Sequence, residues 1–209
     1  MLALREYRSR ADRLADHLPW AALVAPGVVL NKDGSFQRTL RFRGPDLESA
    51  TEAELVSACA RANNVLKRFG SGWALHIEAE RREALGYPTS RFPDAASWLV
   101  DAERRGGFEA AGVHFESRYY LTLTFLPPPD QADAAGRALV ERSGEGQGRD
   151  WRQALAAFVA ETDRALDLFS GFMPEIAGLD DSETLTFLHG TISARRHRVG
   201  VPETPMYLD

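Results

Sequence analysis

The sequence predicts an α+β fold, with an antiparallel or mixed β-sheet that is opened by a β-hairpin and carries helices mainly on one face. Segments with the two-residue period of strands alternate along the chain with segments of helical period. Near the N-terminus, Asp33-Gly34 separates two apolar-rich runs, which is the strongest short-range signal for a hairpin. The 209 residues are 44% hydrophobic and 26% charged, a composition typical of a globular protein with a core that needs no disulfide.

The opening hairpin is expected to pair strands near residues 22–31 and 35–43. Further along, helices and strands alternate, bounded by Gly, Pro or capping residues. In chain order we expect a helix at 51–69, a strand at 73–82, a helix from Asp94 to Gly106-Gly107, a strand at 114–126, a helix at 150–172, a short strand at 174–180 and a helix at 180–199. Residues 127–150 are expected to be a loose connector.

The register of the hairpin depends on the length of its loop, and the sequence leaves two registers open. A two-residue turn places Val29 on the same face as Leu40 and Phe42. An odd, bulged loop places Val28 and Leu30 on that face instead.

The apolar positions predict which faces of the later elements are buried. The strand at 73–82 is interpreted as half-buried, with an apolar side formed by Trp73, Leu75, Ile77 and Ala79. The next strand places on one face Phe115, Tyr119, Leu121, Leu123 and Phe125. The long helix that follows has a buried side formed by Leu155, Phe158, Val159, Thr162, Leu166 and Phe169. Cys59 is expected to be a buried or half-buried helical thiol.

The charge balance argues against a dedicated nucleic-acid binder, because the net charge is -5 and the pI is ≈ 5.6.

The N-terminus lacks the apolar core of a signal peptide. The longest uncharged apolar run, Leu18 to Leu30, is shorter than the ~20 residues that span a bilayer. The single cysteine cannot form an intrachain disulfide. Together these features predict a cytoplasmic protein.

The motifs of the chain predict no catalytic, cofactor-binding or metal site. A P-loop needs a lysine between Gly and Ser or Thr, and the only two lysines, Lys32 and Lys67, stand in no such context. The five histidines form no zinc motif, and no Gly-x-Ser-x-Gly nucleophile motif occurs. Glu78 and Glu80 are interpreted as a solvated strand face opposite neighbours such as Arg118.

Two further features are candidates for recognition. The basic run at 194–198 is interpreted as solvated arginines that complement the dipole of the last helix, with a contact to nucleic acid or lipid head groups as the alternative. The apolar run led by Trp20 is interpreted as a buried first strand, with a surface for a membrane protein or a bilayer as the alternative.

Asp180-Asp181 is interpreted as a helix cap.

Nearly the whole chain is covered, in order, by seven segments with a family character: REYRSRADRLADHLPWAALVAPGVVLNKDGSFQRTLRFRGPDLESATEAEL, GSGWALHIEAERR, YPTSRFPDAASWLVDAERR, HFESRYYLTLTFLPP, DWRQALAAFVAETDRALDLFSGFMPE, LDDSETLTFLHGTISARRHRV and VPETPMYLD. These segments resemble the N-terminal region of the TrbE/VirB-type ATPases of conjugative type IV secretion systems, most closely the TrbE branch.

The resemblance implies a parent ATPase in the bacterial cytoplasm, associated with the inner membrane, that drives transfer or machine assembly. Its P-loop, with ATP and Mg, is expected downstream of Asp209, so no family catalytic residue is assigned here. Residues 1–200 are expected to form the N-terminal α+β assembly domain, and 201–209 to begin a linker toward the ATPase domain. The implied partners are inner-membrane subunits and other copies of the ATPase. Nucleic acid is not expected, and membrane contact is peripheral at most.

The docking hypothesis combines apolar residues of the first strand with two arginines at the open face of the hairpin, namely Leu18, Trp20, Leu23, Val24, Arg41 and Arg43. The alternative function is a single-stranded DNA-binding module of the conjugation apparatus, which requires a basic groove with stacking aromatic side chains. Tyr119, Tyr120 and the arginines supply parts of such a groove, and the acidic pI counts against it.

Overall fold

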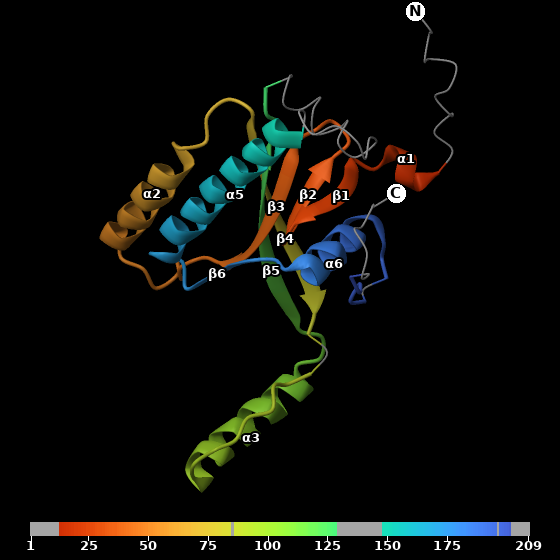
Figure 1. Cartoon of the computed structure of the whole chain (residues 1–209). Helices are drawn as coiled ribbons and strands as arrows, with labels where there is room; N and C mark the ends of the chain where they lie inside the picture. The colour runs from red at the N-terminus through yellow and green to blue at the C-terminus, as the bar shows by residue number, and fades with distance from the viewer. Residues whose placement is uncertain (1–12, 85, 129–147, 196, 202–209) are drawn as a thin grey trace, which may run out of the picture.

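The computed structural model describes residues 13–84, 86–128, 148–195 and 197–201, and it confirms the α+β class (Figure 1). The elements, in chain order, are α1 (Leu14–His17), β1 (Trp20–Ala25), β2 (Val28–Asn31), β3 (Phe36–Arg43), α2 (Glu52–Leu66), β4 (Trp73–Glu83), α3 (Ala95–Ala110), β5 (Phe115–Phe125), α5 (Gly148–Ser170), β6 (Glu175–Gly178) and α6 (Asp181–Ile192). The predicted connector at 127–150 and the start of a linker at 201–209 lie almost entirely outside the described residues.

The strands form one antiparallel sheet in the order β1-β2-β3-β5-β4. Strand β3 is long enough to serve two short neighbours on the same edge. Its first part, from Phe36 to Arg38, pairs with β2, and its second part, from Leu40 to Arg43, pairs with β6. The other edge of β3 pairs with β5, so β3 and β5 form the centre of the sheet.

The predicted strand at 22–31 is wrong as one strand, because the chain reverses at Pro26-Gly27 and forms the separate strands β1 and β2. Pro26 lacks the N–H that a continuous strand would use, and Gly27 adopts φ +67°, a conformation that side chains with a Cβ rarely take. The same glycine lies against the backbone of Leu179, where a Cβ would come within 2.2 Å of the carbonyl oxygen.

The register of the β2–β3 hairpin follows the bulged alternative. Val28 and Leu30 lie on the face of Leu40 and Phe42, and Val29 faces the other side. The backbone N–H of Asn31 donates to the carbonyl of Ser35 at 2.8 Å and closes a loop that contains the three residues 32–34.

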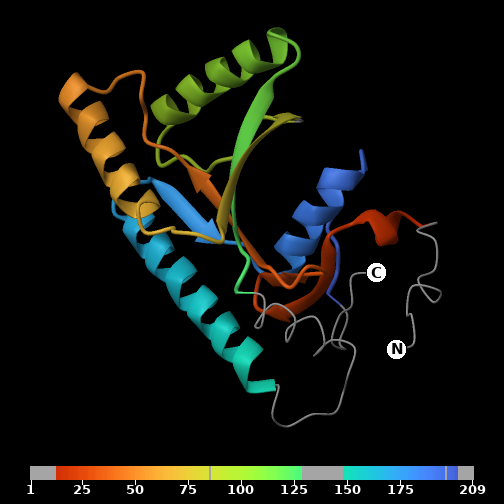
Figure 2. The ribbon, with the colours of Figure 1, turned by 90° about the horizontal axis from the view of Figure 1, so that it is seen from above.

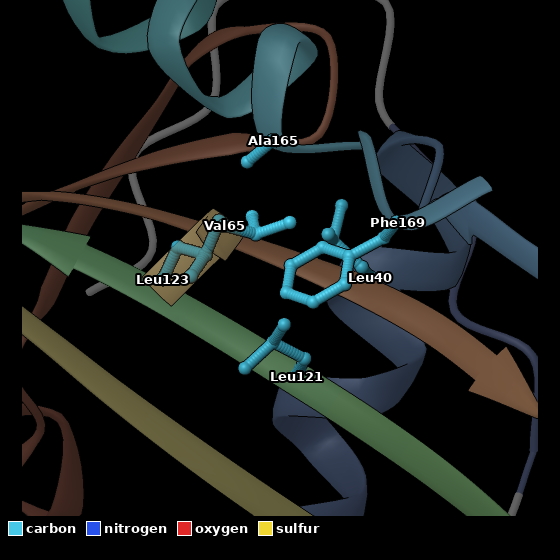
Figure 3. Close-up of a cluster of buried hydrophobic side chains, with 6 residues drawn as sticks. All are labelled: Leu40, Val65, Leu121, Leu123, Ala165 and Phe169. Atoms are coloured by element: carbon cyan, nitrogen blue, oxygen red, sulfur yellow. The ribbon is translucent and has the colours of Figure 1, made fainter. Parts of the chain in front are cut away.

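Helices α2 and α5 cover one face of the sheet, and α6 lies on the other (Figures 1 and 2). One core cluster joins β3, β5, α2 and α5 through Leu40, Val65, Leu121, Leu123, Ala165 and Phe169 (Figure 3). A second cluster joins β2, β3 and the first half of α5 through Val28, Leu30, Phe36, Ala154 and Phe158. The predicted apolar side of α5 is confirmed, because Phe158, Thr162 and Phe169 are buried.

Helix α6 contacts the opposite face through an aromatic pair and through a hydrogen bond between a backbone N–H and a carboxylate. The rings of Tyr120 and Phe187 lie 4.7 Å apart. The backbone N–H of Gly27 donates to Asp181 at 2.7 Å, so α6 also holds the β1–β2 turn. The helix ends at Ile192, so the arginines predicted at its end lie beyond it.

Local signals placed the helix starts correctly. Thr51 with Glu54 forms a capping box at α2, Asp180 caps α6 in the same way, and Asp94 caps α3. Two further expectations are wrong: α3 continues through Gly106-Gly107 to Ala110, and Cys59 is exposed.

Candidate docking surfaces

The first candidate surface is an arm, residues 77–119. Here β4 and β5 extend beyond the part of the sheet that α2 and α5 cover, and α3 connects the two strands at the far end (Figure 1). The two strands pair without a bulge from Trp73 opposite Phe125 to Glu83 opposite Phe115. No residue of β4 is buried, and none of α3 is buried either.

Apolar side chains are exposed over the whole arm. Ile77 is 74% exposed, although its strand neighbour Leu121 is buried. Other large apolar residues of the arm that face solvent are Trp98, Leu99, Val100, Val113, Phe115 and Tyr119. The expectation of a half-buried β4 is therefore wrong beyond Trp73, because Leu75 and Ile77 are 36% and 74% exposed and belong to neither core cluster of the described residues.

Helix α3 is fixed on the arm by a small polar and aromatic cluster. The Tyr87 hydroxyl donates to the Asp101 carboxylate at 2.8 Å, and this bond raises the pKa of Tyr87 above its ordinary value. The Phe108 ring stacks on the His114 ring at 3.8 Å and meets the Tyr87 ring edge to face. The guanidinium of Arg105 lies over the Tyr87 ring at 5.0 Å. The arm is thus an ordered element with its apolar side chains turned outward.

A second candidate surface is a groove of about 310 Å³ between the sheet and α6. Its charged lining consists of the four arginines Arg41, Arg82, Arg118 and Arg198 and the four acids Glu78, Glu80, Asp180 and Glu183. This balance gives the groove no dominant charge and no preference for a polyanion.

The charges in this groove also bind one another. Arg82 pairs with Glu80 at 2.6 Å, and the hydrogen bond to that carboxylate raises the pKa of the Arg82 guanidinium. Arg41 pairs with Glu183 at 3.2 Å. The interpretation of the acidic pair on β4 as a solvated face is correct for Glu78, which is exposed, and wrong for Glu80, whose side chain is 9% exposed. Glu80 does lie opposite Arg118, as predicted.

The four apolar residues of the predicted docking surface lie on two sides of the sheet. Leu18 and Trp20 are half-buried at the start of β1. Leu23 pairs with Val29, on the α6 side, whereas Val24 packs against the core cluster under α5. Leu23 and Val24 are consecutive in β1, and successive side chains of a strand point to opposite faces of the sheet.

The two arginines of that hypothesis are exposed but lie at the other end of the sheet. Trp20 pairs with Asn31, next to the β2–β3 loop, while Arg41 and Arg43 lie past the opposite end of β2 and beside β6. Arg43 pairs with Glu175 at 3.6 Å. The structure therefore does not bring all six predicted residues together, and their docking role stays a prediction.

Sequence reasoning missed the arm, although one signal for it is present. Trp98, Leu99 and Val100 are consecutive, and three consecutive residues of a helix cannot all face one core.

Among the described residues, no group of three or more His, Cys, Asp or Glu side chains is placed to hold a metal ion. In the same regions of the chain, no helix is both long and apolar enough to cross a bilayer.

Comparison with known proteins gives a consistent family. The profile of the N-terminal domain of the type IV secretion system ATPase VirB4/TrbE matches residues 27–133, a range that includes the arm. The chain is 33% identical to the conjugal transfer protein TrbE of Rhizobium radiobacter, over 100% of this chain and 27% of that protein. It is 39% identical to a probable conjugal transfer protein TrbE of Sinorhizobium fredii, over 69% of this chain and 99% of that protein.

A more distant relative is the type IV secretion system protein virB4 of Brucella suis, which is 24% identical over 92% of this chain and 25% of that protein. The chain thus spans about a quarter of the length of the Rhizobium and Brucella relatives.

Proposed function

This chain belongs to the VirB4/TrbE family of type IV secretion system ATPases, in its N-terminal domain, and on that premise we propose that it is an assembly module. Its task is to dock the ATPase onto neighbouring protomers and onto inner-membrane subunits of a conjugative transfer machine. The observation that carries this proposal is the arm, with its outward apolar side chains.

An exposed apolar surface of this kind is characteristic of interaction sites, because water contact with large apolar patches is unfavourable. Trp98 is 59% exposed, and tryptophan is enriched among the residues that carry most of the binding energy of protein interfaces; Leu99 beside it adds exposed apolar area. The Tyr87–Asp101 bond and the ring stacking beneath α3 hold the helix in place before binding, so little conformational entropy is lost on docking.

In the proposed division of labour, residues 1–200 dock and the region downstream of residue 209 binds ATP and Mg and hydrolyses ATP. The proposed location is the cytoplasmic side of the inner membrane. This division is supported by the length of the relatives, of which this chain matches 27% and 25%.

Single-stranded DNA binding is the weaker alternative. The aromatic residue Tyr120 is buried beneath Phe187, and so is not available to stack on bases. The arginines of the groove beside it are balanced by carboxylates.

The test replaces the exposed anchors of the arm in the full-length ATPase. Trp98→Asp with Leu99→Asp is expected to reduce conjugative transfer by at least tenfold, since charges cannot enter an apolar interface, while ATP hydrolysis and the melting temperature stay unchanged. Crosslinking from a photoreactive residue at position 99 should identify inner-membrane subunits or other ATPase copies. The matched control is Glu103→Gln on the exposed side of α3.

The docking hypothesis at β1 is tested in the same assay with Trp20→Asp and Leu23→Asp. Loss of partner capture with an intact fold would support a contact at β1, whereas unfolding would show that these half-buried side chains belong to the core.

Unchanged transfer and no crosslinks from the arm variants would contradict the arm as the docking element.

A further inference from the structure

Strand β4 is the end of the sheet and offers a long unpaired edge. It pairs with β5 on one side, and no described strand lies on its other side. Natural edge strands are commonly kept short or interrupted by Pro, a bulge or charge. Strand β4 is 11 residues long, contains no proline and pairs with β5 without a bulge, and although its second half is charged, Trp73 to Ile77 carry no Asp, Glu, Lys or Arg. Its backbone can therefore accept a further strand.

The side chains of β4 indicate which strand fits this edge. On the face toward α2 and α5, but beyond the part that these helices cover, β4 carries Leu75, Ile77 and Ala79, and the opposite face carries His76 and Glu78. This pattern is self-complementary when it is read in the reverse direction. We infer that β4 pairs antiparallel with β4 of a second copy of this chain, around a two-fold axis through Ile77.

Antiparallel pairing around an axis normal to the sheet keeps equivalent faces on the same side. With Ile77 at the axis, Ile77 meets its own copy, and Leu75 meets Ala79 of the second copy. On the opposite face, His76 meets Glu78 of the second copy, and this pair occurs twice. Each imidazole and carboxylate can then share a charge-assisted hydrogen bond.

Other registers are less favourable. Moving the axis to Glu78 places two copies of that carboxylate opposite each other. Moving it to Ala79 places Glu78 opposite Glu80 of the second copy, and like charges opposite each other are unfavourable. Moving it toward Trp73 removes the two His76–Glu78 pairs and shortens the overlap.

Two copies joined in this way form one continuous sheet, with the exposed apolar stripes of both β4 strands side by side. A strand from a different protein could use the same backbone edge, but the reciprocal His76–Glu78 pairs arise only when both strands have this sequence. The inference rests on the proposed assembly function and names one of its partners, a second copy of the chain.

The first test measures the mass of the 209-residue chain by light scattering and sedimentation. A dimer is expected, and Ile77→Lys should make it monomeric, because two ammonium groups would meet at the axis. Circular dichroism should be unchanged, since Ile77 is 74% exposed. Glu103→Lys, which introduces the same residue on the exposed side of α3, should leave the dimer intact and serves as the control.

The second test reads the register with cysteines. In a Cys59→Ser background, Ile77→Cys should form a disulfide across the axis under mild oxidation. Ala79→Cys should not, because its two copies would lie about 13 Å apart along the strands, beyond the ~7 Å that a disulfide can bridge between Cα atoms.

A charge exchange adds a third reading. His76→Glu alone should weaken the dimer at least tenfold, and combining it with Glu78→His should restore it, because the opposite pairs are re-formed. A monomeric wild-type chain, crosslinking through Ala79→Cys instead of Ile77→Cys, or no rescue by the double variant would each overturn the inference. A monomeric chain whose arm still crosslinks to inner-membrane subunits would overturn only this inference and leave the proposed function standing.

Discussion

The same two strands behave differently in the body and in the arm of this molecule. On the face toward α2 and α5, every second residue of β5 from Phe115 to Phe125 is aromatic or aliphatic except Ser117. Leu123, in the body, is 0% exposed, whereas Phe115, in the arm, is 55% exposed. The strand pattern is the same in both regions, and only the covering helices differ. A strand can therefore be strongly patterned for burial and still serve as a binding surface.

The contrast between body and arm predicts a large difference in the cost of truncating an aromatic residue. Phe158→Ala removes a ring that is 1% exposed and lies 5.5 Å from the Trp73 ring, so the free energy of unfolding should fall by about 3–5 kcal/mol. Trp98→Ala in the arm should change it by about 0.5 kcal/mol or less. Urea unfolding followed by circular dichroism measures both, and similar losses would mean that the arm is part of the core.

Two glycines with positive φ allow a matched comparison of backbone contacts. Gly27→Ala in the body should cost about 2–4 kcal/mol, because the strained φ of +67° is combined with a clash against the Leu179 carbonyl. Gly112→Ala in the arm has φ +84° and no atom within 4 Å of the added Cβ, so strain alone should cost about 1–2 kcal/mol. Thermal unfolding of the two variants tests this order, and equal costs would show that the Gly27 contact yields easily.

The smallest expected effect is a pH-dependent fraying of the arm helix. The backbone N–H of Ser97, and then its hydroxyl, donate to Asp94 and hold the pKa of that carboxyl below its ordinary 3.8. The stabilisation by this cap is present above about pH 4 and is lost as the pH falls through the lowered folded value. Hydrogen–deuterium exchange of the backbone amides in the first turn of α3 should then become faster, after correction for the intrinsic exchange rate at each pH.

The control for this effect is Asp94→Asn, which keeps a capping oxygen but does not titrate, and should remove the pH dependence. The helix α2 provides the comparison in the body. Bonds from the Thr51 backbone and hydroxyl also lower the pKa of Glu54, but Val65 anchors α2 in the core. A first turn of α2 that frayed as much as that of α3 would contradict a protective role of the core.

Much of the fold could be predicted from local patterns. The capping residues Thr51, Asp94 and Asp180 marked the starts of three helices, and the period of two residues identified β4 and β5. The single strand predicted at 22–31 was wrong, because an apolar run with Pro and Gly is compatible with either a bulge or a reversal. Leu23 and Val24 of the predicted docking surface lie on opposite faces of the sheet because they are consecutive residues of β1.

The sequence by itself determined the family, the α+β class, and the type and order of most elements, because period, caps and turn residues act within a few positions of the chain. Only the tertiary structure decided which apolar faces are covered. Coverage depends on where α2, α5 and α6 pack, through contacts between residues more than a hundred positions apart, such as Gly27 with Asp181. For that reason the exposure of Ile77 and the open edge of β4 became visible only in the folded molecule.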